Sequence, residues 1–204
     1  MGYLDGVIAA GRFVCSSVCA SPTSSTLLSF DEWNVCYGLQ WNGIEDSDSR
    51  DWAQAPRLLE NSYSVLDAVV VGSLLIALLG HVDRVAVACL AQLVNVIAPI
   101  MTEPGGPAWR QTTFFPFAQA SKYGRGRVLD VRVDSPTYET EKYGEADLLH
   151  ATAVPAEDGS VTVFAVNRSR TQRVTLHQVS GTTLSDGALS AVLEPLSWNV
   201  IRLG

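Results

Sequence analysis

The spacing of apolar residues changes character partway along the chain, and this change constrains the fold more than any other feature. Residues 26–120 of the 204-residue sequence alternate short apolar runs with longer helical segments. From Val128 onward, apolar and polar residues alternate with a period of two. Alternating strands and helices predict a parallel sheet, and period-two alternation predicts half-buried antiparallel strands. We therefore expect an α/β unit followed by an all-β unit.

The α/β unit is expected to contain two strand–loop–helix repeats. The run LLSF from Leu27 and the run VAVACLAQLVN from Val85 predict strands, the second one buried on both faces. Helices are expected over residues 56–85 and 110–124, with a further helix near the N-terminus. The apolar run Val69–Gly80 is shorter than the roughly 20 residues that cross a bilayer, so it predicts a buried helix.

The all-β unit is expected to be a sandwich of short strands. Asp158-Gly159, between two alternating segments, predicts a tight hairpin. The segments expected to form strands are residues 129–136, 148–155, 160–167, 173–180 and 197–203. Two strand–helix repeats are only a quarter of an eight-stranded barrel, so the first unit is either a small open sheet or the last piece of a larger barrel.

Composition excludes several partners. With 21 acidic and 14 basic residues the net charge is −7, which argues against a nucleic acid, whose phosphates require clustered Lys and Arg. The four cysteines and three histidines form no metal-ligand spacing, so no metal is expected. Reduced thiols, and an N-terminus that is a poor signal peptide, favour a cytoplasmic protein that does not enter a membrane.

Two adjacent carboxylates, Asp31 and Glu32, end the first predicted strand, and Trp33, Asn34 and Tyr37 follow them. In parallel α/β folds, chemistry lies at the carboxyl ends of strands. Because neighbouring strand residues point to opposite faces, only one of the two acids is expected to face a pocket. Such a carboxylate can act as a nucleophile or a general acid, and the aromatic residues suit a sugar. The alternative is that both acids cap a helix or pair with an arginine.

Long ordered motifs resemble the C-terminal part of the family 51 α-L-arabinofuranosidases. They include SFDEWNVCYG, CLAQLVN and TEPGGPAWRQTTFFPF, and the resemblance extends over residues 28–204. It implies the C-terminal remnant of a (β/α)8 TIM barrel over residues 1–125, followed by an antiparallel β-sandwich over residues 126–204. It also implies retaining hydrolysis of terminal, non-reducing α-L-arabinofuranosyl groups from arabinan or arabinoxylan oligosaccharides, without a cofactor, by a protein that forms homo-oligomers.

The same resemblance assigns roles to individual residues. Glu32, the glutamate of FDEWN, corresponds to the catalytic nucleophile, and Gln92 of CLAQLVN corresponds to a residue that hydrogen-bonds the sugar. Asp31 would then point away as structural support. Cys36 stands where the family has a tryptophan that lines the sugar site, so this substrate-binding position loses a large apolar face.

The second catalytic carboxyl group of the family, in a Gly-Asn-Glu type motif, has no counterpart, since the chain contains no Asn-Glu pair. Glu103 is interpreted as loop structure. Because a retaining glycosidase needs two carboxyl groups, we expect the isolated chain to be nearly inactive. Two hypotheses follow: the C-terminal portion of an α-L-arabinofuranosidase, or a non-catalytic carbohydrate-binding or assembly fragment.

Overall fold

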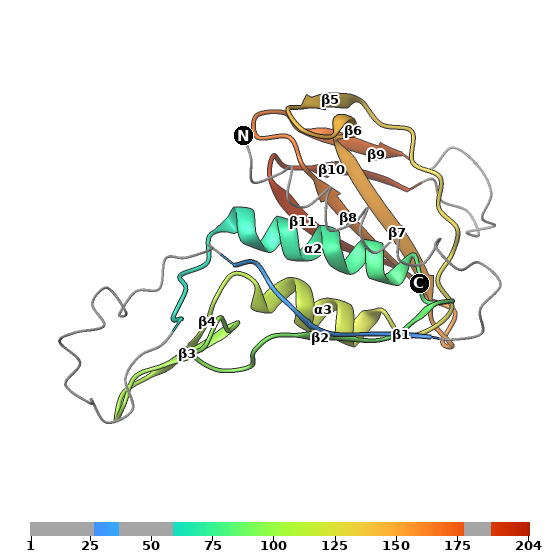
Figure 1. Ribbon diagram of the computed structural model, residues 1–204. Helices are drawn as coiled ribbons and strands as arrows, with labels where there is room; N and C mark the ends of the chain where they lie inside the picture. The colour runs from blue at the N-terminus through green and yellow to red at the C-terminus, as the bar shows by residue number, and fades with distance from the viewer. Residues whose placement is uncertain (1–26, 37–58, 178–188) are drawn as a thin grey trace.

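The computed structural model describes residues 27–36, 59–177 and 189–204 (Figure 1). The helix expected near the N-terminus, and Tyr37, lie outside these residues. The described part consists mostly of strands, with two helices, α2 (Val65–Leu79) and α3 (Phe114–Tyr123). β1 (Leu28–Trp33) and β2 (Val85–Leu90) pair in parallel, with α2 connecting them. The predicted parallel β–α–β arrangement is therefore confirmed.

Helix α2 is buried along its centre because its sequence is apolar on every side. All residues from Val69 to Ile76 are buried. The helix begins later than the sequence predicted, at Val65. Its N-cap residue is Ser64, whose backbone N–H and Oγ donate to the Asp67 carboxylate at 2.6 and 2.8 Å. These bonds satisfy groups that the first helical turn leaves without intrahelical partners, so they fix where the helix starts. No helix in the described part is long and apolar enough to span a membrane.

The β1–β2 sheet is covered on one face only by the described elements, so the prediction that the second strand is buried on both faces is wrong. Phe30 and Leu90 pack against the core that α2 and α3 contribute to. Val87 is 46% exposed and Cys89 is also exposed. The apolar run from Val85 suggested a strand packed on both faces, but α2 and α3 cover only one face of the sheet.

A short hairpin replaces the turn-rich loop expected after the second strand. β3 (Ile100–Thr102) and β4 (Ala108–Arg110) pair antiparallel. Glu103 lies in the intervening turn, where its N–H donates to the Pro107 carbonyl at 3.0 Å and its carbonyl accepts from Gly106 at 2.9 Å. Gly105 adopts φ 68°, which glycine reaches without a steric penalty. This turn returns the chain to the N-terminus of α3.

The all-β unit contains a three-stranded antiparallel sheet in the order β11–β8–β7. Its strands are β7 (Leu149–Pro155), β8 (Val161–Asn167) and β11 (Ser197–Leu203). The Asp158-Gly159 hairpin between β7 and β8 is confirmed, with Gly159 at φ 86°. Two more antiparallel pairs complete the described unit: β5 (Thr137–Thr140) with β6 (Gly144–Asp147), and β9 (Val174–His177) with β10 (Ser190–Leu193).

The strand expected over residues 129–136 does not form. Only Leu129 makes a bridge, to Ala153, with its N–H donating to the Ala153 carbonyl at 2.9 Å. The segment then leaves the sheet edge and contributes Val133 to a second apolar cluster. That cluster joins β7 and β8 to β9 and β10 through Leu149, Ala151, Ala165, Leu193 and their neighbours. Of the apolar positions in this segment, Val133 therefore serves packing between sheets, whereas Val131 is exposed.

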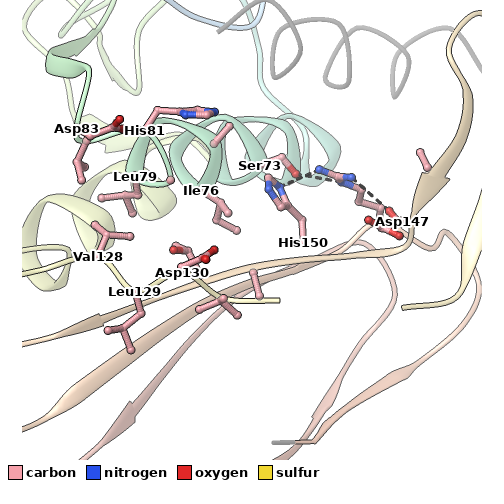
Figure 2. A pocket seen from close by; sticks show the side chains of 18 of the residues that line it. Ser73, Ile76, Leu79, His81, Asp83, Val128, Leu129, Asp130, Asp147 and His150 are labelled. Atoms are coloured by element: carbon pink, nitrogen blue, oxygen red, sulfur yellow. Dashed lines mark hydrogen bonds between the residues drawn. The ribbon is translucent and has the colours of Figure 1, made fainter. Parts of the chain in front are cut away.

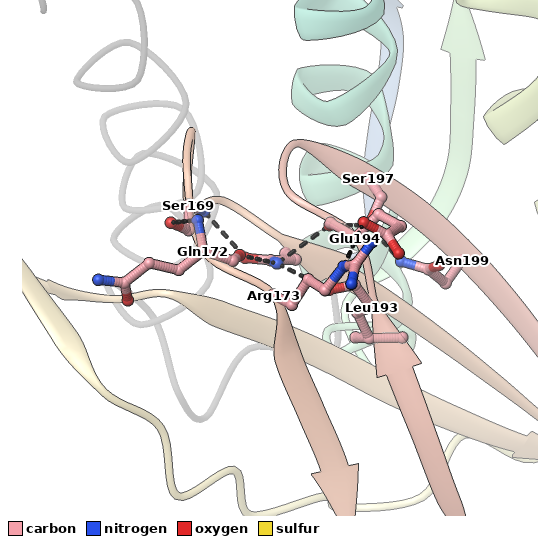
Figure 3. A network of polar contacts seen from close by, with 8 residues as sticks. Ser169, Gln172, Arg173, Leu193, Glu194, Ser197 and Asn199 are labelled. Carbon is pink, nitrogen blue, oxygen red and sulfur yellow. Dashed lines mark hydrogen bonds and ion pairs between the residues drawn. The ribbon is translucent and has the colours of Figure 1, made fainter.

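The turn after β8 lies against the end of β10, and Figure 3 shows Ser169 and Gln172 of that turn beside Leu193 and Glu194. A fully buried asparagine, Asn167, holds the two together. The Asn167 Nδ2 donates to the carbonyls of Gln172, Leu193 and Glu194 at 2.8, 3.1 and 3.0 Å. Its Oδ1 accepts from the Ser169 N–H at 2.9 Å. Both ends of the amide are thus used, which offsets the cost of burying it.

The two units share one apolar core. Phe164 and Val166 of β8 belong to the same buried cluster as the centre of α2. Trp198 of β11, which is partly buried, stacks on Phe164 with ring centroids 5.5 Å apart. Its ring also lies directly against Gly72 of α2. Figure 1 shows α2 lying between α3 and the three-stranded sheet. The boundary expected near residue 125 thus separates segments that fold against each other.

Candidate functional site

The carboxyl ends of β1 and β2 meet at one edge of their sheet, where Glu32 and Gln92 emerge. The parallel register pairs Phe30 with Ala88 and Trp33 with Leu90, and the Ala91 N–H donates to the Trp33 carbonyl at 2.9 Å. Gln92 follows that last ladder bond directly. Both side chains are exposed. The structure therefore brings the two predicted site residues to the same edge.

A bulge in β1 determines how the two acids are presented. The register shifts between the pairs Phe30–Ala88 and Trp33–Leu90, so over this stretch β1 has one residue more than β2. Trp33 is buried and contacts the Phe117 ring of α3, at a centroid distance of 6.5 Å. Both Asp31 and Glu32 are exposed, and neither has a hydrogen bond or ion pair to another described residue. Bulges commonly redirect side chains beside active sites, and this one leaves both carboxylates accessible.

Asn34 ties the end of β1 to the loop that follows β2. Its Nδ2 donates to the carbonyls of Ala91 and Ile97, and its Oδ1 accepts from the Val35 N–H at 2.7 Å. The Tyr63 hydroxyl donates to the Val35 carbonyl at 3.1 Å. These bonds fix the backbone on both sides of Gln92 relative to the backbone that carries Glu32.

Gln111 is a second polar residue that supports this edge from beneath. Its side chain is buried, its Oε1 accepts from the Tyr63 N–H at 2.9 Å, and its Nε2 donates to the carbonyls of Asn61 and Ala98 at 2.9 and 2.8 Å. Sequence reasoning missed both Asn34 and Gln111. Asn34 had a weak signal, since it directly follows the acids and Trp33, whereas Gln111 had none.

Cys36 lies just beyond this edge, as an exposed free thiol. It follows Val35, whose backbone is held by Asn34 and Tyr63. A thiol presents much less apolar surface than an indole ring. The position can therefore contact a ligand at the edge but cannot cover a sugar face as a tryptophan would.

We expect Asn34→Ala to lower the free energy of unfolding by about 1–3 kcal/mol, because it leaves the Ala91 and Ile97 carbonyls without their donor. Chemical denaturation measures this loss. Asn34→Asp is the matched variant: it keeps the acceptor for Val35 but places a charge against two carbonyls, so it should be less stable than wild type at neutral pH and recover when acidified. An Asn34→Ala protein as stable as wild type would show that these bonds do not hold the edge.

The fold and this edge together define a class: a β–α–β unit that carries a carboxylate and an amide at its strand ends, packed on a strand-rich unit. The sequence matches the family described as alpha-L-arabinofuranosidase C-terminal domain over residues 31–197. The chain belongs to this family.

Similar proteins agree with the assignment. The chain is 62% identical over 212 residues to an intracellular exo-α-(1→5)-L-arabinofuranosidase of Streptomyces lividans, covering 86% of this chain and 32% of that protein. It is 57% identical over 143 residues to an exo-α-(1→6)-L-arabinofuranosidase of Bifidobacterium longum, covering 70% of this chain and 27% of that protein.

A solved family 51 α-L-arabinofuranosidase from Bifidobacterium longum superimposes with a TM-score of 0.84 at 35% identity, covering 98% of this chain and 48% of that one. The chain thus spans between about a quarter and a half of the length of these relatives.

Proposed function

We propose that this chain supplies the nucleophile and one sugar contact of a retaining exo-α-L-arabinofuranosidase. The substrates would be arabinan or arabinoxylan oligosaccharides that carry terminal, non-reducing α-L-arabinofuranosyl groups. The observation that carries the proposal is the shared strand edge of Glu32 and Gln92 in a chain of this family. Relatives named as intracellular enzymes support an intracellular location.

The β1–β2 pair is proposed to be the end of a (β/α)8 barrel, and the strand-rich unit an antiparallel sandwich. The half-exposed Val87 supports the first part, because an apolar side chain on the uncovered sheet face is suited to packing inside a closed barrel. The apolar cluster between β7–β8 and β9–β10 supports the second. In the strand-rich unit β11 is the edge strand of its sheet, and edge strands favour assembly, so we propose a homo-oligomer for the whole protein.

In the proposed reaction the Glu32 carboxylate attacks the anomeric carbon on the face opposite the leaving group. The glycosidic C–O bond breaks, and the departing oxygen takes a proton from a second carboxylic acid. Water then cleaves the arabinosyl ester at Glu32, giving its proton to the second group, so that two inversions retain the configuration. The Gln92 amide can both donate to and accept from sugar hydroxyls. Asp31 shapes the edge beside Glu32 without taking part.

The acid step limits what the chain can do by itself. Retaining glycosidases hold two carboxyl groups about 5 Å apart, and this sequence lacks the Asn-Glu pair of the family. We therefore expect negligible turnover of natural arabinosides by the 204-residue chain. An activated aryl leaving group departs without protonation, so it can test the nucleophile separately from the acid.

The decisive experiment uses 2,4-dinitrophenyl 2-deoxy-2-fluoro-α-L-arabinofuranoside. The fluorine slows hydrolysis of the glycosyl ester, so the adduct accumulates and peptide mass spectrometry locates it. We expect labelling at Glu32, none in Glu32→Gln, and unchanged labelling in Asp31→Asn. Labelling of Asp31 instead, or no labelling at either carboxylate, would contradict the proposed nucleophile.

The second candidate function is a non-catalytic carbohydrate-binding or assembly fragment. The observation in its favour is that the strand-rich unit has an apolar cluster of its own, around Leu149 and Leu193. Sugar binding without any label at Glu32 would favour this alternative.

A further inference from the structure

A second concave surface lies away from the edge that carries Glu32. An open cavity of about 800 Å³ lies between the C-terminal half of α2 and part of β7 (Figure 2). Its lining includes Gly80, His81 and Asp83, which precede β2, whereas Gln92 follows β2. Because a six-residue strand spans about 20 Å, the cavity lies at the opposite end of the β1–β2 sheet from the candidate site.

One wall of the cavity presents fixed N–H donors. Arg168 donates from Nε to the Ser73 Oγ at 3.4 Å and from the guanidinium to the Asp147 carbonyl at 3.2 Å; it also lies 2.8 Å from His150 Nδ1. A guanidinium has no acceptor, so His150 Nδ1 accepts and the ring proton lies on Nε2. Burial, followed by the Arg168 charge, lowers the pKa of His150 to about 3, so the ring is neutral near pH 7.

The rim of the cavity carries hydrogen-bond acceptors instead of donors. Figure 2 shows Asp83, Asp130 and Asp147 around the opening, and all three are exposed. Carboxylates are pure acceptors, each able to receive several hydrogen bonds. Between the rim and the N–H wall the lining is apolar. Its larger apolar members include Ile76, Leu79, Val128 and Leu129.

This mixture of groups excludes several ligand classes. An anion would be repelled by the carboxylates of the lining and by the negative end of the α2 dipole. The described residues contain no group of three or more side chains suited to a metal ion. An uncharged polyhydroxylated ring can satisfy both sides, because each hydroxyl can donate to a carboxylate and accept from an N–H. Its C–H face would pack on the apolar lining.

We propose that this cavity is a secondary binding site for an uncharged saccharide of one or two rings. Its volume lies within the usual range for small-ligand sites. The proposal goes beyond the proposed function, because the site lies at the other end of the sheet and uses none of the residues assigned to catalysis. A saccharide held here would keep an oligosaccharide substrate close to the protein without being cleaved.

The test is a titration of the ¹⁵N-labelled chain with L-arabinose and with arabinobiose, followed by amide NMR. We expect the Leu129, Asp130 and Ala151 amides to shift together and saturate. Asp130→Asn should raise the Kd about tenfold, since it replaces a charged acceptor by a neutral one. Asp134→Asn makes the same charge change at an exposed position outside the lining and should leave the Kd unchanged, as should Glu32→Gln.

Several results would overturn the proposal. One is the absence of saturable shifts at the cavity with either sugar. Another is an equal response of Asp130→Asn and Asp134→Asn. Glycerol binding as tightly as arabinobiose would reduce the site to unspecific polyol contact. Shifts confined to Trp33 and Gln92 would overturn the secondary site while supporting the proposed function.

Discussion

Replacing Gly72 by alanine should destabilise the protein by about 2–4 kcal/mol, although the same change within a helix usually stabilises by up to about 1 kcal/mol. Gly72 lies in the buried centre of α2, where an added Cβ would overlap Cε3 of Trp198 and approach Cζ3 to 3.0 Å. The indole cannot easily move, because its ring stacks on Phe164 and its Nε1 donates to the Gln119 Oε1 at 2.7 Å. The clash must therefore be relieved by separating α2 from β11.

Urea unfolding of Gly72→Ala and wild type measures this cost. Gly80→Ala is the matched control: Gly80 ends the same helix at φ −64°, and a Cβ there would come no closer than 3.5 Å to its nearest neighbours, so its stability should change little. In a Trp198→Leu background the cost of Gly72→Ala should largely disappear, since the two positions are coupled through contact. Equal costs in both backgrounds would refute the steric explanation.

The larger elements of the fold could be predicted from the sequence. The centre of α2 is apolar on every side, so its length and composition required a buried helix whatever covered it. The parallel pairing of β1 with β2 followed from the helix between them. The hairpin at Asp158-Gly159 followed from turn chemistry, which is local.

Short polar strands could not be predicted in this way. The β5–β6 hairpin pairs Thr137–Thr140 with Gly144–Asp147, and most of these side chains are exposed. Its turn depends on a side-chain bond, from the Thr140 Oγ1 to the Gly144 carbonyl at 2.6 Å, rather than on an apolar pattern. Conversely, residues 129–136 alternate like a strand, but only Leu129 forms a bridge and Val133 packs on the apolar cluster between the sheets.

In the candidate site, too, some residues could be predicted from the sequence and others could not. Glu32 lies near the carboxyl end of β1 and Gln92 lies just beyond that of β2, so the rule for carboxyl ends of parallel strands placed them on one edge. Asn34 and Gln111 act through carbonyl groups 57–63 and 13–50 residues away. No sequence pattern specifies where those carbonyls will lie once the loops have folded.

Acidification should weaken folding through His150, whose pKa falls to about 3 in the folded chain from an ordinary value of 6.5. The unfolded chain then binds one more proton than the folded chain between these values, so stability is complete above about pH 6.5 and is lost as the pH falls toward 3. Between pH 7 and pH 4 this group alone should remove about 3 kcal/mol from the free energy of unfolding.

His150→Asn isolates that contribution, because an amide oxygen can accept from Arg168 as Nδ1 does but does not titrate. The surrounding carboxylates, including Asp147 and Asp130, are the same in both proteins, so their effects cancel in the comparison. Urea unfolding at pH 7, 5.5 and 4 should therefore give a shallower loss of stability for His150→Asn than for wild type. Parallel losses would mean that the imidazole is protonated in the folded chain, and that His150 adds a second positive charge beside Arg168 at low pH.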